Sequence, residues 1–170
     1  DWQELISDIS QTTDIIMLSE VRASEALFAQ RATSMLHKMN EESHWNMVCS
    51  DPSGPGTAEI HVMFYRDYIN IVRKQTLKSI GVVKMDHSPF SVLFRDSREG
   101  GGDVVLTSVH MPPENRARER DIQISKLIAS YRNDSSTRAD TPFTGKGAKD
   151  AKLPFVSHVI GGDWNTFVGC

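Results

Sequence analysis

Strand-length apolar segments follow one another through the middle of this 170-residue chain, and this run constrains its fold more than any other feature. Each segment is rich in branched and aromatic residues and is bounded by turn residues, such as the glycines at 100–102. Short connections between successive strands predict an antiparallel meander rather than a helical bundle. A short strand is expected at Trp45–Cys49, and longer ones at Ala58–Tyr65, Ile69–Leu77, Ser88–Phe94 and Val104–His110.

Helical patterns precede this run of strands. Apolar residues near the N-terminus recur at the spacing of one helix face, and a second apolar face follows an N-cap serine, Ser24, and ends near Asn40. A short buried strand is expected between these two helices, at Asp14–Leu18. The apolar positions are Trp2, Leu5, Ile6 and Ile9 in the first helix and Phe28, Ala32, Met35, Leu36 and Met39 in the second.

The last third of the chain begins with a break at Pro112-Pro113. A third helix is expected from about Asn115, with an inner face marked by Ile124, Leu127, Ile128 and Tyr131. Residues 133–152 are rich in small polar residues and Lys without apolar periodicity, and we interpret them as a mobile surface loop. Phe155–Ile160 is apolar enough for a last buried strand. This mixture of helices and strands predicts one α/β (α+β) domain over residues 1–170.

Composition excludes a membrane-spanning protein and says little about partners. Hydrophobic residues make up 39% of the chain and charged residues 24%, and no apolar run approaches the roughly 20 residues that cross a bilayer. The net charge of −3 is not that of a basic nucleic-acid module, but divalent cations can supply the positive charge in a nuclease. Cys49 and Cys170 are interpreted as free thiols. No signal peptide is visible, and the compartment stays open.

Polar residues stand at the ends of four predicted apolar strands. Glu20 follows the first strand, Glu59 opens a long one, His110 closes another, and Asp163 with Asn165 follows the last. If these ends converge, three carboxylates, one imidazole and one amide would suit a hard divalent cation and a water nucleophile. Taken singly, each residue also fits a structural role, as a solvated charge, a core histidine or a turn former. Their joint occurrence favours a functional site.

Four segments that carry these residues resemble motifs of the endonuclease/exonuclease/phosphatase superfamily, the deoxyribonuclease I-like proteins. The segments are Asp14–Val21, Glu59–Arg66, Leu106–His110 and Gly162–Asn165, in the order in which the family has them. The resemblance implies a four-layer α/β/β/α sandwich. This chain would supply about the first half to two-thirds of it, as a single partial domain.

The resemblance also implies a role for each residue. Glu20 would bind a catalytic Mg²⁺ or Mn²⁺ ion, and His110 would act on the scissile phosphate as a general acid or as a stabiliser of developing charge. Glu59 would orient His110. Asp163 would orient or deprotonate the attacking water, and Asn165 would donate a hydrogen bond to a phosphate oxygen.

These roles describe metal-dependent phosphodiester hydrolysis, and a nuclease acting on nucleic acid is the first interpretation. Alternatives on the same fold are hydrolysis of inositol phosphate, sphingomyelin or tyrosyl-DNA bonds, or a non-catalytic interaction subunit. Arg116, at the start of the third helix, is a weaker candidate for contact with a phosphate, and we prefer to interpret it as part of a solvated helix face on which Arg and Glu interleave.

The chain also departs from the family pattern. Ser19 stands where the family commonly has Gln, and His87-Ser88-Pro89 stands where deoxyribonuclease I has an arginine–glutamate–proline stretch that contacts DNA. The family's first strand and its late Asp-His pair lie outside these 170 residues, so most of the second sheet is expected to be missing. A fragment of a longer protein, a chain completed by a partner and a structural subunit would each explain this. We favour the fragment, because the signature residues are retained together.

Overall fold

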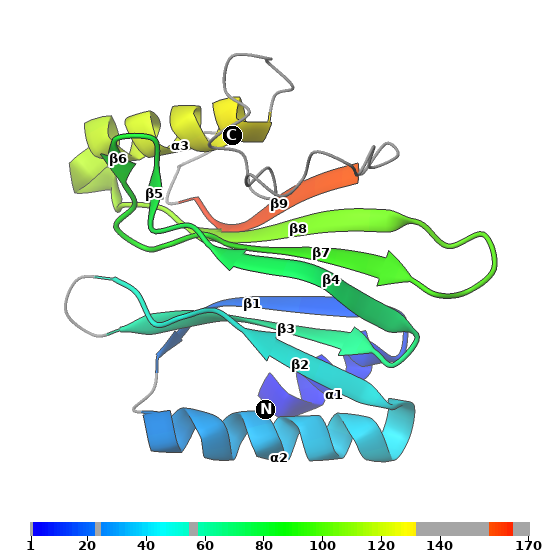
Figure 1. Ribbon diagram of the computed structural model, residues 1–170. Coiled ribbons are helices and arrows are strands. Elements are labelled where there is room, and N and C mark those ends of the chain that lie inside the picture. The colour runs from blue at the N-terminus through cyan, green and yellow to red at the C-terminus, as the bar shows by residue number, and fades with distance from the viewer. Residues whose placement is uncertain (1, 23–24, 55–57, 132–156, 165–170) are drawn as a thin grey trace, which may run out of the picture.

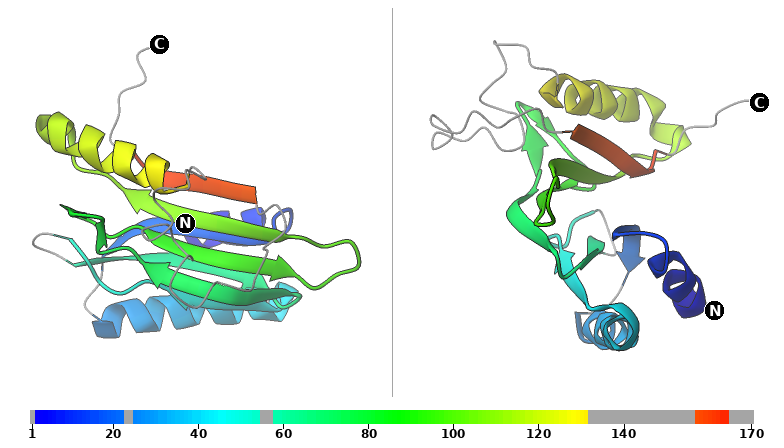
Figure 2. Two further views of the ribbon diagram at one scale, coloured as in Figure 1. Left: turned by 45° about the horizontal axis from the view of Figure 1, so that its top comes forward. Right: turned by 90° about the vertical axis from the view of Figure 1, so that its right-hand side faces the viewer.

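The computed structural model describes residues 2–22, 25–54, 58–131 and 157–164. They form two β-sheets stacked face to face, with α2 (Glu25–Ser43) outside one sheet and α3 (Ala117–Tyr131) outside the other (Figure 1). The turned views in Figure 2 show the same layers, with α1 (Trp2–Ser10) beside the first sheet. This succession of helix, sheet, sheet and helix confirms the predicted four-layer α/β/β/α sandwich.

The first sheet has three antiparallel strands in the order β1-β3-β2. The central strand is nearly all buried, because one of its faces meets the helices and the other meets the second sheet. Its strands are β1 (Ile15–Arg22), β2 (Trp45–Cys49) and β3 (Glu59–Arg66).

Helices α1 and α2 cover the outer face of this sheet. The apolar face expected for the second helix is the one that packs, since Ala32, Met35 and Met39 are buried there. In α1 Ile6 is buried in the same core, but Leu5 is 59% exposed, so the stripe predicted for that helix is only partly inside.

The second sheet has four strands in the order β4-β7-β8-β9. The pairs β4–β7 and β7–β8 are antiparallel, whereas β9 runs parallel to β8. A small hairpin, β5 (Ser79–Ile80) with β6 (Val83–Lys84), lies beside α3, and the 3₁₀ turn η1 (Glu114–Arg116) leads into that helix. The four strands are β4 (Ile69–Thr76), β7 (Phe90–Asp96), β8 (Asp103–His110) and β9 (Ser157–Asp163).

The predicted meander is wrong at the step from β3 to β4, since these two strands lie in different sheets. Both edges of β3 are occupied by β1 and β2, so β4 finds no free edge there and passes to the facing sheet. The connecting turn is tied to both sides: the backbone N–H of Asp67 donates to His44, and the backbone oxygen of Tyr68 accepts from Ser97. A short turn between two strands does not decide whether they pair or face each other.

The expectation that most of the second sheet would be missing is also wrong. It counted the consecutive strands as one sheet, whereas three of them and β9 form the second sheet. The apolar layer between the sheets is therefore present, with Met63 of the first sheet packed against Val92 and Phe94 of the second.

Several smaller expectations change or lie outside the described residues. The third helix begins at Ala117 after a 3₁₀ turn; its Leu127 is fully buried, but Ile128 is 40% exposed. The cap at Ser24, the loop at 133–152, Phe155 at the start of the last predicted strand and the thiol of Cys170 are not described. Cys49 is a free thiol. Over the described ranges, no helix is long and apolar enough to cross a membrane.

Candidate active site

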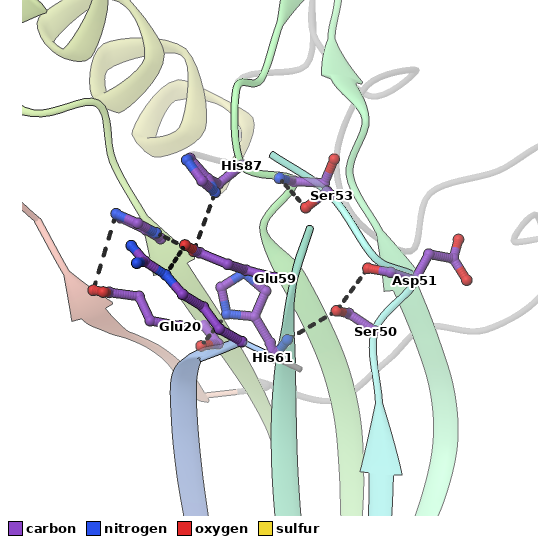
Figure 3. Close-up of polar contacts among 11 residues, drawn as sticks. Glu20, Ser50, Asp51, Ser53, Glu59, His61 and His87 are labelled. Carbon is purple, nitrogen blue, oxygen red and sulfur yellow. Dashed lines mark hydrogen bonds and ion pairs between the residues drawn. The ribbon is translucent and has the colours of Figure 1, made fainter. Parts of the chain in front are cut away.

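Glu20, Glu59, His110 and Asp163 meet at one end of the sandwich. Strands β8 and β9 are parallel, and their register pairs His110 directly with Asp163. Strands β1 and β3 are antiparallel, so the end of β1 lies beside the start of β3, where Arg22 pairs with Glu59. The chain direction of each strand therefore delivers its polar residue to the same edge, which is the region drawn in Figure 3.

A β-bulge directs Glu20. Leu18 pairs with Val62 and Val21 with Ile60, so two residues of β1, Ser19 and Glu20, stand opposite one residue of β3. The backbone of Glu20 has φ 56°, in the left-handed region that non-glycine residues seldom adopt. Bulges re-aim side chains, and such a conformation costs about 1–3 kcal/mol. Glu20 is thus inside a strand that continues to Arg22, not beyond the end of it as predicted.

Glu59 and His110 form a buried hydrogen-bonded pair. Nδ1 of His110 lies 2.8 Å from Oε2 of Glu59, and the two side chains are 12% and 8% exposed. Nε of Arg22 donates to the other carboxylate oxygen at 3.0 Å. Burial by itself raises the pKa of Glu59, but the hydrogen bonds from His110 and Arg22 outweigh it and hold that pKa below its usual value. An ionised carboxylate accepts only, so the proton lies on Nδ1 and Nε2 is left to face outward.

Glu20, His110 and Asp163 form a second group on the other side of the imidazole. Nε2 of His110 lies 3.9 Å from Oε1 of Glu20, and one ligand atom from each residue lies within 4.8 Å of the others. Burial raises the pKa of Glu20, and a side-chain hydrogen bond with Asp163 and the charge of that residue raise it further. Two carboxylates this close favour a shared proton or a bound cation.

This donor set fits a hard divalent ion. Carboxylate oxygens are the ligands preferred by Mg²⁺ and Mn²⁺, and burial and the neighbouring Asp163 raise the pKa of Glu20 although His110 acts in the opposite direction. Glu59, in contrast, is neutralised by Arg22 and His110. Of the two groups, Glu20 with Asp163 therefore offers the carboxylate oxygens that could hold such an ion.

His87 belongs to the site although it was not among the predicted site residues. Its ring stacks on that of His110 with centroids 4.1 Å apart and planes inclined by 28°, and its Nδ1 lies 3.4 Å from Oε2 of Glu59 (Figure 3). Glu59, His87 and His110 also bring ligand atoms within 4.8 Å. The two Nδ1 atoms lie 2.8 Å and 3.4 Å from the same oxygen, Oε2 of Glu59, so this is a second group that could hold an ion.

His61 lies one layer deeper and was also missed. It follows Glu59 by two residues on the same face of β3, as Ser108 precedes His110 on β8, and its Nδ1 is 2.8 Å from Oγ of Ser108. Burial, with the charges of His110 and His87, lowers the pKa of His61 to about 4. The period of two along a strand is the one sequence signal that links His61 to Glu59.

The other two predicted residues are not brought into this cluster by the described structure. Asn165 lies outside the described residues. The guanidinium of Arg116 is held by Asp86, with Nη1 2.6 Å from Oδ2, and by Glu119 one turn along the helix. Glu119 belongs to the helix and Asp86 does not, and contact of Arg116 with a phosphate stays a prediction.

Comparison with known proteins finds likeness in structure rather than in sequence. No family model and no curated protein matches the chain. The human Nocturnin catalytic domain with bound sulfate matches 98% of this chain and 56% of its own length, at TM-score 0.63 and 14% identity. ANGEL2, described as a 2',3'-cyclic phosphatase, matches 99% and 43%, at TM-score 0.66 and 15% identity.

A third match is TDP2 from D. rerio in complex with a single-stranded DNA product, which covers 97% of this chain and 53% of its own length at TM-score 0.59 and 14% identity. The chain thus spans about half the length of the solved structures that it matches. The two stacked sheets, the flanking helices and these matches over nearly all of its residues show that the chain has the deoxyribonuclease I-like fold.

Proposed function

We propose that the protein carrying this chain hydrolyses phosphodiester bonds with the help of a divalent metal ion, and that its substrate is nucleic acid. One observation carries the proposal: a buried Glu59–His110 pair stands beside two carboxylates, Glu20 and Asp163, that share one hydrogen bond. The fold adds support, because ANGEL2 is described as a cyclic phosphatase and TDP2 was crystallised with a DNA product.

His110 would act directly on the phosphate. Glu59 fixes its tautomer through Nδ1, which leaves Nε2 facing the Glu20–Asp163 side, where the substrate would bind. Protonated at both nitrogens, the imidazolium would donate a proton from Nε2 or stabilise negative charge there as the bond to the leaving group breaks. Glu59 is thus a positioning residue, and Arg22 keeps it ionised.

Glu20 and Asp163 would hold the Mg²⁺ or Mn²⁺ ion. The ion supplies positive charge against the phosphate oxygens, which an acidic chain of net charge −3 does not otherwise concentrate here. Asp163 would in addition orient or deprotonate the attacking water, and Asn165, two residues later, would donate to a phosphate oxygen. Two ionised carboxylates this close repel each other, and a cation bound between Glu20 and Asp163 would offset that repulsion.

The test uses the full-length protein with Mg²⁺ or Mn²⁺. Its substrates are single-stranded DNA, duplex DNA, RNA, an inositol phosphate, sphingomyelin and a tyrosyl-DNA oligonucleotide, each with and without EDTA. Chelator-sensitive cleavage of a nucleic acid supports the proposal, and cleavage confined to another substrate assigns a different phosphodiesterase or phosphatase. Absence of turnover on every substrate, in a folded protein that binds Mn²⁺, would overturn it in favour of a non-catalytic subunit.

A further inference from the structure

We infer that His87 is a positioning residue that holds the imidazole of His110 against Glu59. The inference rests on the proposed function only in that His110 is taken to act on the phosphate. His87 was not singled out by any strand-end motif, and its place at the site follows from the fold alone.

The first support is the contact between the two imidazoles. The rings stack at 4.1 Å with a 28° inclination, and the His87 side chain is 12% exposed. A flat ring against the face of His110 leaves that imidazole less room to turn about its χ angles. It also keeps water from one side of the hydrogen bond between Nδ1 of His110 and Oε2 of Glu59.

The second support is the way His87 itself is held. The backbone of Gly54, at φ 115°, lies so close that a Cβ there would be 2.7 Å from Cε1 and Nδ1 of His87. Any larger residue at 54 would therefore push the ring. The close approach of backbone to ring is the kind of position that requires glycine.

The third support is the anchoring of the segment that carries His87. The backbone N–H of Ser88 donates to Oγ of Ser53 at 2.9 Å, and the backbone of Ser88 is also hydrogen-bonded by the side chain of His61. The next residue, Pro89, accepts from the backbone of Leu77 at 2.8 Å. Three parts of the fold thus fix this segment, although it lies between strands.

His87 acts through packing rather than through a strong hydrogen bond of its own. Oε1 of Glu59 is taken by Arg22 and Oε2 by His110, and the 3.4 Å from Oε2 to Nδ1 of His87 is long. Nδ1 of His87 is buried and has no hydrogen-bond partner among the residues that the structure describes. The flat ring of Phe, which has no nitrogen, should therefore replace His87 better than the small side chain of Ala or the flexible polar side chain of Gln.

Three variants test this in the full-length protein: His87→Ala, His87→Gln and His87→Phe. The first readout is the NMR resonance of the Nδ1 proton of His110, assigned by its loss in His110→Gln and recorded without substrate. We expect it to broaden by exchange with water in His87→Ala and His87→Gln, and to remain in His87→Phe. If it persists unchanged in all three variants, His87 does not position His110.

The second readout is steady-state cleavage. Small misplacement of a catalytic group costs about ten- to a hundredfold, so kcat should fall by that range in His87→Ala and His87→Gln with KM nearly unchanged. His87→Phe should recover kcat to within a few fold. Equal loss in all three variants would overturn the inference and assign the nitrogens of His87 a direct contact. If the parent protein has no turnover, the proposed function fails, and the NMR result alone decides the role of His87.

Discussion

Glu59 is the residue on which the polar contacts of the site converge. Its two oxygens receive Arg22 and His110, and His87 approaches from a third direction. A carboxylate buried among three basic groups stays ionised, and it imposes one orientation on each neighbour. At the scale of single residues, the site is therefore an ionised carboxylate, Glu59, that orients the imidazoles and lies beside the carboxylate pair Glu20 and Asp163.

His61 gives a pH-dependent contribution to stability. Its pKa is about 4 in the folded protein and 6.5 in the unfolded chain, so the folded state binds fewer protons at this ring between those values. The free energy of unfolding should fall by about 2 kcal/mol from this side chain between pH 7 and pH 5. Urea unfolding at both pH values, with EDTA present, measures it.

The variant His61→Gln keeps hydrogen-bonding groups but does not titrate. It should be less stable than the parent at pH 7, and the gap should narrow by about 2 kcal/mol at pH 5. His87 and His158, whose pKa values are also lowered by burial, titrate in both proteins and cancel in the comparison. A gap that is the same at both pH values would show that the His61 ring is not held neutral.

At the scale of elements, two strand irregularities place the carboxylates. The bulge in β1 turns Glu20 toward His110, and close approach of β9 to β8 at Gly162 brings Asp163 alongside it. Both features sit within strands whose apolar pattern is otherwise regular. The strands act as a frame, and the irregular residues direct the chemistry.

The left-handed backbone at Glu20 predicts that some substitutions there stabilise the fold relative to others while all of them weaken metal binding. Glycine adopts φ 56° without strain, whereas alanine does not, so Glu20→Gly should be more stable than Glu20→Ala by about 1 kcal/mol. Both should bind Mn²⁺ more weakly than the parent. Thermal unfolding and metal titration of the two variants check this, and equal stability would mean that the left-handed backbone is absent.

Gly162 is required by the packing of β9 on β8. A Cβ at this residue, where φ is 130°, would lie 2.1 Å from the backbone oxygen of Val109. Gly162→Ala should therefore cost about 3 kcal/mol of unfolding free energy and weaken Mn²⁺ binding by moving Asp163. Gly102→Ala is the matched control, since a Cβ there meets nothing within 4 Å. If the two variants lose equal stability, the close contact between the strands does not exist.

At the scale of the whole molecule, the sequence predicts where the strands lie better than it predicts which strands pair with each other. Apolar patterns locate β3, β7 and β8 within a few residues, because they depend on local alternation and turn residues. Which strands pair is set by packing between segments far apart in the chain, so the passage from β3 to β4 across the sandwich was missed.

In the site, too, the residues in local motifs were predicted, whereas a contact that depends on long-range packing was not. Glu20, Glu59, His110 and Asp163 stand in motifs that can be recognised locally, and the fold brings all four together. His87 lies in a connection that was compared with a DNA-contacting stretch of the family, and its neighbours His110 and Gly54 are more than twenty residues away in sequence. That comparison did not predict its contact with His110, which depends on the fold.

Substitution of Asp163 tests the central claim most directly. Cleavage of the preferred nucleic acid and binding of Mn²⁺ should be measured for the full-length parent, for Asp163→Asn and for Asp121→Asn, a matched change on α3 at a side chain that is 71% exposed. We predict that Asp163→Asn folds normally, binds Mn²⁺ more weakly and loses at least about a hundredfold in kcat, and that Asp121→Asn behaves as the parent. Unaltered metal-dependent cleavage by Asp163→Asn would contradict the account.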